Sequence, residues 1–307
     1  MTIRQSGLAV THDGAFHADE VFATAVLTMA VPELRVCRTR DPETIAQAEI
    51  VYDVGGTYDP ADLRFDHHMA SPPLREDGTP YSSAGLVWRE FGAQAIRRSG
   101  PIAGTDDLIL AIRDQIDQEF VRIIDRVDNG VENIGPTDVI AVIGRLNPTH
   151  LERGGDDAQA IATLRFNQAV DLARDILIRL IRNHAAVTAG EAAFLDAVGR
   201  SDDSRLAVLD TYTPWQKAVF SNGLSDLLYV VAPSGTRGQW GVSTVPAEMG
   251  SFENRKSLPA NWAGLTDQDL QAVSGVHDAV FCHRNLFIAV AGSKEGALKL
   301  AQKALAA

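Results

Sequence analysis

Residues 8–30, LAVTHDGAFHADEVFATAVLTMA, place a short apolar run, a polar turn and a helical pattern in direct succession. The run ending at Val10 is typical of a buried strand, and Gly14 marks the turn after it. From residue 18 to residue 30 the apolar side chains recur at helical spacing, and Pro32 ends the pattern. The segment therefore predicts a strand and a helix, joined by a turn rich in histidine and aspartate.

The same alternation continues outward from this segment. Residues 34–37 and 49–54 are typical of further strands, and a short helix is expected after Asp41. Because strands that alternate with helices form parallel sheets, we expect an α/β fold with a doubly wound parallel sheet. We also expect a helical extension to this domain, with helices at 84–98, from 105 onward and from 156 to 189.

After residue 204, strand-like runs become more frequent. The stretch 199–204, GRSDDS, is small, polar and rich in turn formers, which is typical of a domain boundary. We therefore predict a first domain over residues 1–203 and a second, smaller α/β domain over residues 204–307. Strands are expected there at 206–209, 227–231, 240–245, 279–282 and 286–291, and helices at 215–220, 267–273 and 295–305.

The composition narrows the functional classes. A chain of 307 residues fits two domains, and 45% hydrophobic against 22% charged residues supports buried cores. The formal net charge is −12, with −13 on residues 1–203 and +1 on residues 204–307. Tight, sequence-independent binding of duplex DNA needs many cationic contacts to phosphates, so this balance argues against it. The two cysteines, Cys37 and Cys282, are too few for a disulfide framework or a cysteine-built zinc site.

Membrane and export signals are also missing from the sequence. No apolar run approaches the ~18 residues that span a bilayer, and the first residues have no signal-peptide core. We therefore expect a soluble, cytoplasmic protein without a membrane partner. The sequence leaves the oligomeric state open, and a homodimer is compatible with it.

Histidine and aspartate gather near the predicted strand ends. The three groups are His12-Asp13, His17-Ala18-Asp19 and Asp66-His67-His68, and Asp53 ends the third predicted strand. The carboxyl ends of strands form the ligand crevice in doubly wound sheets. Imidazole and carboxylate together suit divalent ions such as Mn²⁺, Fe²⁺ or Zn²⁺. The groups therefore predict a metal site, although any one of these residues alone would more often be a cap or a surface group.

Four stretches resemble, in order, the signature motifs of the DHH phosphoesterase superfamily. They are THDGAFHADE, VYDVGG, FDHH and RVDNG. The segments HDGAFHADEVFA, RTRDP, VYDVGGTYDP and SSAGLVW, followed by SLPANWAGL and GVHDAVFCHRNLFIAVAG, are similar to one branch, the melanocyte-proliferating-gene-1 family of metal-dependent hydrolases. The resemblance covers nearly the whole chain. It implies a DHH-type catalytic domain, and 3′–5′ RNA exonuclease activity is associated with eukaryotic relatives of this branch.

The resemblance also implies two divalent metal ions, with Mn²⁺ preferred and Mg²⁺, Fe²⁺ or Zn²⁺ as alternatives. The implied ligands are His12, His17 and Asp53 for one ion, and Asp19, Asp53, His67 and Asp128 for the other. In this scheme Asp53 bridges the ions, His68 faces the substrate phosphate and Asp66 orients a neighbouring ligand. Two divalent ions and three aspartates leave a net charge of about +1, which suits a phosphodiester.

His17 departs from the superfamily pattern. Most members have aspartate at this place, and the spacing from His12 is one residue longer here. Asp13 and Glu20 are therefore alternative ligands. An additional imidazole in the centre would also change its metal preference.

Other candidates lie outside the metal motifs. Arg38 and Arg40 flank a strand end and either meet a phosphate or form a solvated pair. Ser82-Ser83 opens a helix, where it serves as a plain N-cap or presents amides to a phosphate. In the second domain, five residues resemble family positions near the substrate, with packing as the alternative for each, above all for the tryptophan: Arg255, Lys256, Trp262, His277 and His283.

The sequence therefore predicts a dinuclear metal-dependent phosphoesterase. We expect a 3′–5′ exonuclease that acts on RNA or a short single-stranded oligonucleotide, with the polarity taken from the resemblance alone. A phosphatase of small nucleotides or polyphosphate is the alternative among enzymes. A non-catalytic metal-binding regulator is the alternative from another class, and the complete ligand set argues against it.

Overall fold

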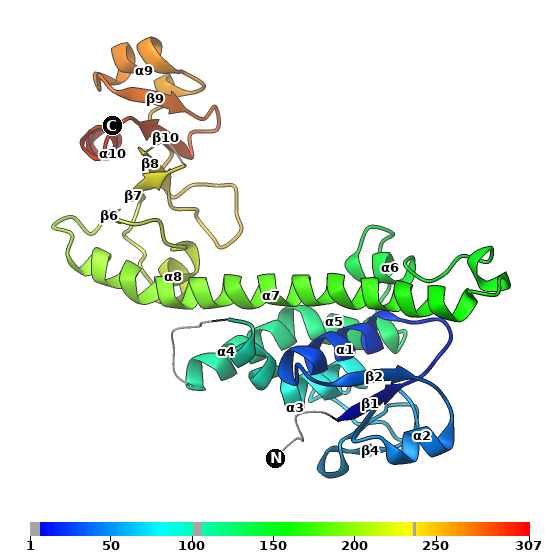
Figure 1. The fold of residues 1–307 in the computed structure, drawn as a ribbon. Coiled ribbons are helices and arrows are strands. Elements are labelled where there is room, and N and C mark those ends of the chain that lie inside the picture. Colours follow the sequence, from blue (N-terminus) through cyan, green and yellow to red (C-terminus); the bar gives the residue numbers. More distant parts are fainter. Residues whose placement is uncertain (1–6, 101–105, 236–237) are drawn as a thin grey trace. The chain divides into compact units, whose positions relative to one another are not determined.

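The computed structural model describes residues 7–100, 106–235 and 238–307, and these fall into two compact units. The first unit ends at Ala185 and the second begins at Ala186. Both positions lie within one helix, α7 (Ala158–Gly199), so the last turns of α7 are part of the second unit (Figure 1). That residues 1–203 form a catalytic domain and residues 204–307 a substrate-binding domain stays a prediction.

The first unit is built on a five-stranded sheet in the order β2-β1-β3-β5-β4. Strands β1, β2, β3 and β5 run parallel, whereas β4 pairs antiparallel with β5 at the edge. The strands are β1 (Leu8–Thr11), β2 (Arg35–Arg38), β3 (Ile50–Tyr52), β4 (Tyr58–Asp59) and β5 (Arg64–Phe65). The 3₁₀ turn η1 (Pro60–Asp62) joins the last two strands.

Helices cover both faces of this sheet (Figure 1). Ala9, Ile50 and Tyr52 point into the large core formed with α1 (Ala18–Ala30) and α3 (Ser83–Arg98). Their neighbours Val10 and Val51 point the other way, toward α2 (Pro42–Gln47). Alternate strand residues thus bury opposite faces, which confirms the predicted doubly wound α/β fold.

The helical extension packs onto the α1 and α3 side of the sheet. Buried side chains of α4, α5, α6 and the first part of α7 share one core with α1 and α3. A π-helical turn, η2, separates α4 from α5 and shifts the register between them. The segments are α4 (Asp106–Ile116), η2 (Asp117–Val121), α5 (Arg122–Asp128), α6 (Val139–Gly144) and η3 (Glu152–Gly154).

The second unit contains a five-stranded sheet in the order β6-β7-β8-β10-β9. Only the β6–β7 pair is parallel among the described strands of this sheet. The strands are β6 (Leu206–Val208), β7 (Tyr229–Ser234), β8 (Gln239–Thr244), β9 (Ala279–Cys282) and β10 (Ile288–Ala291). The helical segments are α8 (Gln216–Ser221), η4 (Ala260–Trp262), α9 (Asp267–Ser274) and α10 (Lys294–Ala306).

Several predicted bounds change in the structure. The third strand stops at Tyr52, because Asp53 has a positive φ of 55° and leaves the extended conformation. The long helix continues ten residues past Ala189, to Gly199, and there Phe194 joins the core of the second unit. The helix expected from Thr105 begins at Asp106, and Thr105 itself lies outside the described residues. Within the described chain, no helix has the length and apolar character needed to cross a bilayer.

Candidate metal centre

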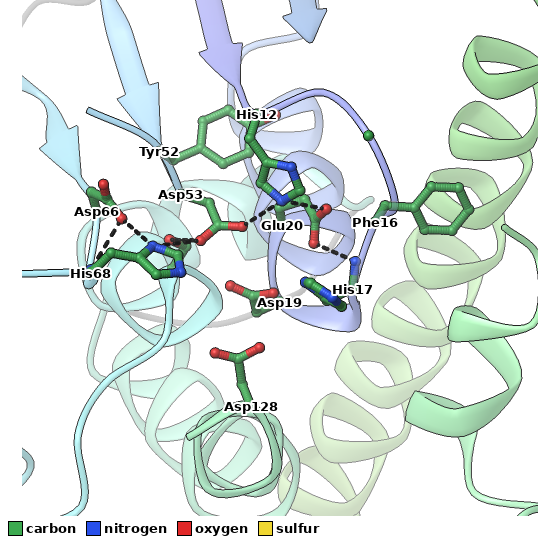
Figure 2. Close-up of polar contacts among 12 residues, drawn as sticks. His12, Phe16, His17, Asp19, Glu20, Tyr52, Asp53, Asp66, His68 and Asp128 are labelled. Carbon is green, nitrogen blue, oxygen red and sulfur yellow. Dashed lines mark hydrogen bonds and ion pairs between the residues drawn. The ribbon is translucent and has the colours of Figure 1, made fainter. Parts of the chain in front are cut away.

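The candidate site lies where the parallel strands of the first unit end. His12 follows β1, Asp53 follows β3 and Asp66 follows β5, so these residues emerge at the same edge of the sheet. Asp19, in the first turn of α1, and Asp128, the last residue of α5, face them across a cavity of about 700 Å³ (Figure 2). The cavity is lined by all six predicted metal ligands and by Asp66 and His68.

Asp53 lies between two histidines. Its Oδ2 atom is 3.2 Å from His12 Nε2, and its Oδ1 atom is 3.2 Å from His67 Nε2. Although burial opposes the shift, these histidines lower the pKa of the Asp53 carboxyl, which stays ionised. Its positive φ is a conformation that aspartate tolerates better than most residues, and it turns the carboxylate away from the strand. Asp53 therefore has one oxygen toward each histidine, and its bridging role stays a prediction.

His12 presents one ring nitrogen to the cluster. Its Nδ1 donates to the Asp13 carbonyl at 2.7 Å, which leaves Nε2 between Asp53 and Glu20. Burial opposes a positive charge here, but hydrogen bonds with Asp53 and Glu20 raise the pKa of His12 to about 10. Protonated His12 therefore supplies a positive charge among these carboxylates when no metal is bound.

Two further carboxylates are fully enclosed on α1. Glu20 accepts the backbone N–H of His17 through Oε2 at 2.8 Å, which caps the helix, and its Oε1 lies 3.0 Å from His12 Nε2. Both carboxylate oxygens of Asp19 are buried without a hydrogen-bond partner among the described residues. Burial raises the pKa of Asp19 well above its usual value, and the charges of Asp53 and Asp128 raise it further.

His67 and Asp128 complete the other side of the cluster. His67 Nε2 lies 3.5 Å from Asp128 Oδ2 and 3.7 Å from Asp19 Oδ2. Although burial opposes it, Asp53 and Asp128 raise the pKa of His67. Burial, together with the charge of Asp53, raises the pKa of Asp128.

These residues fit divalent metal ions. Buried carboxylates at such distances repel one another, and the unpartnered oxygens of Asp19 lack a compensating donor. Four groups of three residues have ligand atoms within 4.8 Å of one another: His12, His17 and Glu20; Asp53, His67 and His68; His17, Asp19 and Asp128; and Asp19, Glu20 and Asp53. Overlapping groups of histidine and carboxylate are a donor set for adjacent ions of the Mn²⁺, Fe²⁺ or Zn²⁺ type.

His17 is placed beside the centre, at the N-terminus of α1. Its side chain is exposed, and it lies close enough to Asp19 and Asp128, or to His12 and Glu20, to share an ion with either pair. The alternative ligands proposed for it differ in position. Glu20 is buried inside the cluster, whereas the half-exposed side chain of Asp13 lies 3.5 Å from Arg40 Nε.

His68 lies at the edge of the cluster and is open to the cavity, with its Nδ1 atom 3.6 Å from Asp53 Oδ1. Its side chain is 62% exposed, against 8% for His67. Asp66 Oδ1 accepts from His68 Nδ1 at 2.8 Å, and Asp66 also accepts the backbone N–H groups of Gly56, His67 and His68. Asp66 therefore fixes the ring so that Nε2 is available to a ligand in the cavity.

Two side chains, those of Asn147 and Arg38, hold the loop between His12 and His17. The Asn147 side chain accepts the Phe16 N–H at 2.8 Å and donates to the Phe16 carbonyl at 2.6 Å. Arg38 donates to the Gly14 carbonyl, and its guanidinium lies over the ring of Phe166, 4.4 Å from the ring centre. Burial lowers the pKa of Arg38. Arg38 supports this loop, and Arg40, from the same strand end, lines the cavity.

Residues at the N-terminus of α3 form hydrogen bonds with residues in and around the centre. Ser83 Oγ lies 2.9 Å from its acceptor, the Phe65 carbonyl, and 3.3 Å from Asp53 Oδ1. The buried carboxylate of Asp125 accepts the N–H and hydroxyl of Ser82 and pairs with Arg75 Nε at 2.6 Å. Ser82 stands at the N-cap position of α3 without a capping bond from its own side chain, and Asp125 accepts the Gly85 N–H there instead. Asp125 thus ties α3 to α5, which carries Asp128.

The candidates of the second unit take part in its own packing. Arg255 Nη1 donates to the carbonyls of Leu224 and Leu227, and Lys256 Nζ donates to the Leu305 carbonyl at the end of α10. His283 Nδ1 accepts the N–H of Asn285.

Two other candidates of this unit differ in exposure. The side chain of His277 is exposed, whereas Trp262 is buried in the core. The substrate contacts proposed for these residues and for Arg255, Lys256 and His283 stay predictions.

Sequence reasoning missed several residues that build the centre. Glu20 was considered as a substitute for His17, yet it is as buried as Asp19 and touches His12. The sequence does mark Glu20 in one way, because its spacing from His17 is that of a capping box. No local pattern marks Asn147, Asp125 and Arg75, which lie 42 or more residues from the respective partners Phe16, Ser82 and Asp117.

The chain is similar to known proteins over nearly its whole length. Residues 8–305 match the MYG1_exonuc family model, described as an uncharacterised protein family (UPF0160). Human "MYG1 exonuclease" is 33% identical over 325 residues, covering 96% of this chain and 85% of the human protein. "MYG1 protein" of Dictyostelium discoideum is 29% identical over 96% of this chain and 95% of its own length.

Among solved structures, RecJ of Thermus thermophilus in complex with Mn²⁺ is similar at 15% sequence identity, with a TM-score of 0.31. The match covers 99% of this chain and 53% of RecJ, so the chain spans about half of the RecJ chain.

Proposed function

The chain belongs to the MYG1 exonuclease family (UPF0160), and from this premise we propose that it is a metal-dependent 3′–5′ exonuclease acting on RNA or short single-stranded oligonucleotides. The exonuclease name of the human, bovine and rodent relatives supports hydrolysis of phosphodiester bonds. The preference for RNA and the 3′–5′ direction rest on the motif resemblance alone.

The observation that carries the proposal is the cluster of carboxylates around Asp53, in which Asp19, Glu20 and Asp53 are buried and Asp128 is half-buried. Asp19, Glu20, Asp53 and Asp128 bring a charge of −4 when ionised, and two divalent ions would bring +4. As a fourth carboxylate, Glu20 lowers the net charge of the centre with both ions bound from about +1 to about zero. Because the ions offset the carboxylate charges, the metal-bound centre does not repel a negatively charged substrate phosphate.

The chain's own ligands divide into two groups around the shared carboxylate. His12, with Glu20 beside it, lies on the Oδ2 side of Asp53, and His67, with Asp128 beside it, lies on the Oδ1 side. His17 and Asp19 have ligand atoms close to members of both groups. Ions bound there would polarise the phosphoryl oxygens and lower the pKa of a coordinated water. Because histidine nitrogens are mixed with carboxylates, Mn²⁺ suits the centre better than Mg²⁺, which prefers oxygen ligands.

His68 supplies the group that meets the substrate. With Nδ1 donating to Asp66, a proton on Nε2 points into the cavity and can be donated to a phosphoryl or leaving oxygen. The acid role therefore belongs to His68, and Asp66 positions it.

The test uses the full chain, stripped of metal and reloaded with Mn²⁺, Mg²⁺ or Zn²⁺. The substrates are single-stranded RNA and DNA labelled at either end, a duplex, a dinucleotide and inorganic pyrophosphate. We expect Mn²⁺-dependent release of mononucleotides from the 3′ end of the single-stranded RNA. Release from the 5′ end would overturn the direction, and hydrolysis of pyrophosphate alone would replace the exonuclease by a phosphatase.

A further inference from the structure

A second cavity, of about 620 Å³, adjoins the candidate metal centre. Five of its lining residues also line the first cavity: His17, Asp19, His67, His68 and Asp128. A ligand whose phosphate contacts these side chains therefore has direct access to the second cavity. Its volume exceeds that of one nucleoside, and it lies within the size range of small-molecule sites.

The other walls of this cavity are largely aliphatic. Met69 and Pro72 come from the segment after His68, Ile124 and Val127 from α5, and Ile140 from α6. No lysine or arginine is among its described lining residues. A second phosphate placed there would lose its hydration without gaining a cation, whereas a planar organic ring gains from leaving water.

The first cavity is polar where Arg40 lines it. Arg40 lines it together with Asp13, Gly55 and Gly56, and Arg40 does not line the aliphatic cavity. Its guanidinium is largely exposed and lies 3.5 Å from Asp13 Oδ1. The centre is thus flanked by a polar end with a cation and by an apolar end. A substrate with a ring on one side of its reacting phosphate and charged groups on the other matches this polarity.

We propose that the aliphatic cavity between α5, α6 and the segment after His68 is a nucleoside subsite. It would hold the base and sugar attached to the phosphate that reacts, while the remaining phosphates extend toward Arg40. The inference rests on the proposed function and narrows it, because inorganic polyphosphate has no group that gains from this cavity.

Gly144 offers a way to fill the cavity without replacing any candidate metal ligand. This exposed residue ends α6 and lines the aliphatic cavity, and a Cβ added to it meets no described atom within 4 Å. Gly144→Phe therefore adds a ring at the wall of the cavity, where the first added carbon meets open space. Gly154→Phe is the matched control, since Gly154 is also exposed, has the same free space and lines neither cavity.

The experiment measures binding to the Mn²⁺-loaded full chain by calorimetry. The probes are adenosine 5′-monophosphate, adenosine 3′-monophosphate and inorganic phosphate. In the unmodified chain, at least one nucleotide should bind about tenfold tighter than phosphate. Gly144→Phe should remove that advantage and leave phosphate binding unchanged, and Gly154→Phe should change neither.

Ile140→Ser is a second variant that shortens the apolar wall instead of filling the cavity. It should weaken the same nucleotide several-fold, with phosphate again unchanged. Equal affinity of nucleotides and phosphate in the unmodified chain would overturn the subsite, as would full nucleotide affinity in both variants.

Dinucleotide hydrolysis by the unmodified chain keeps the two proposals apart. If hydrolysis persists while the nucleotide advantage is absent, the subsite fails and the proposed function stands. If no diester is hydrolysed with any metal, the proposed function fails.

Discussion

Asp53 presents one carboxylate oxygen to each of two histidines, 3.2 Å from the Nε2 atoms of His12 and His67. Asp53→Asn keeps the shape of this group and removes the charge that both ions would share. We expect metal content and phosphodiesterase turnover to fall together, with turnover reduced about 100-fold or more. Metal analysis and a rate assay on the same preparation test this, with the exposed Asp62→Asn as control. Full occupancy with normal turnover would contradict the bridging position.

For the adjacent histidines, we expect His67 to bind metal and His68 to take part in the chemistry. His67 is buried against three carboxylates, whereas the His68 ring is exposed to the cavity and held by Asp66. His67→Ala should therefore lose metal, and His68→Ala should keep its metal but lose turnover by about 100-fold. Metal titration and kinetics at saturating Mn²⁺ distinguish the two. Equal loss of metal in both variants would show that the roles are assigned wrongly.

At the scale of elements, the join between α3 and α5 positions the centre. A Cβ added to Gly85 would overlap the Asp125 carboxylate, which caps the start of α3. Gly85→Ala should therefore force these helices apart and lower the free energy of unfolding by about 1–3 kcal/mol. It should also weaken metal binding, because Ser83 and Asp128 lie at the two ends that move. Urea unfolding and metal titration measure both effects.

Gly154→Ala is the matched control for this prediction, since a Cβ there meets no described atom within 4 Å. The control should match the parent chain in both measurements. A Gly85→Ala protein with unchanged stability would mean that the helices accommodate the methyl group, and the join would then not determine the position of Asp128.

Elements with a strong period were predictable, and those defined by distant contacts were not. The alternation of apolar runs and helical patterns gave the doubly wound fold, and β9 has the predicted bounds. The β4–β5 hairpin was missed because its strands have two residues each and no period. The carboxylates at strand ends were predictable from topology. The supports of the centre, such as Asn147 and Asp125, were not, because only tertiary packing brings them to their partners.

At the scale of the whole molecule, the two units should respond to different perturbations. The buried carboxylates belong to the first unit, and their repulsion is compensated when cations bind. Free metal at about 100 times its dissociation constant should stabilise the first unit by about 3 kcal/mol, and a chelator should reverse this. Peptide-resolved hydrogen exchange is the measurement, with peptides of the β7–β8 pair as internal control. Equal protection in both units with and without metal would contradict the site.

Alkaline pH should act on the second unit through two buried neutral groups. Burial raises the pKa of the Cys282 thiol to about 11 and the pKa of the Tyr229 hydroxyl to about 12. Both groups donate to backbone carbonyls as neutral species, the thiol to His283 and the hydroxyl to Ser257. A folded pKa above the unfolded one means that the stabilisation is complete below the unfolded pKa, about 9 for the thiol, and is lost as pH rises through the folded value.

The free energy of unfolding of the second unit should therefore hold up to about pH 9 and fall by about 3 kcal/mol toward pH 11 from the thiol alone. Trp215, Trp240 and Trp262 belong to this unit, so tryptophan fluorescence in urea mainly reports its unfolding. Cys282→Ala removes the ionising group and should flatten the loss between pH 9 and 11, although it is less stable at neutral pH because it leaves a small void. Cys37→Ala, in the first unit, should follow the unmodified chain. If Cys282→Ala kept the full alkaline slope, the loss would have to come from groups other than the buried thiol, with Tyr229 as the next to test.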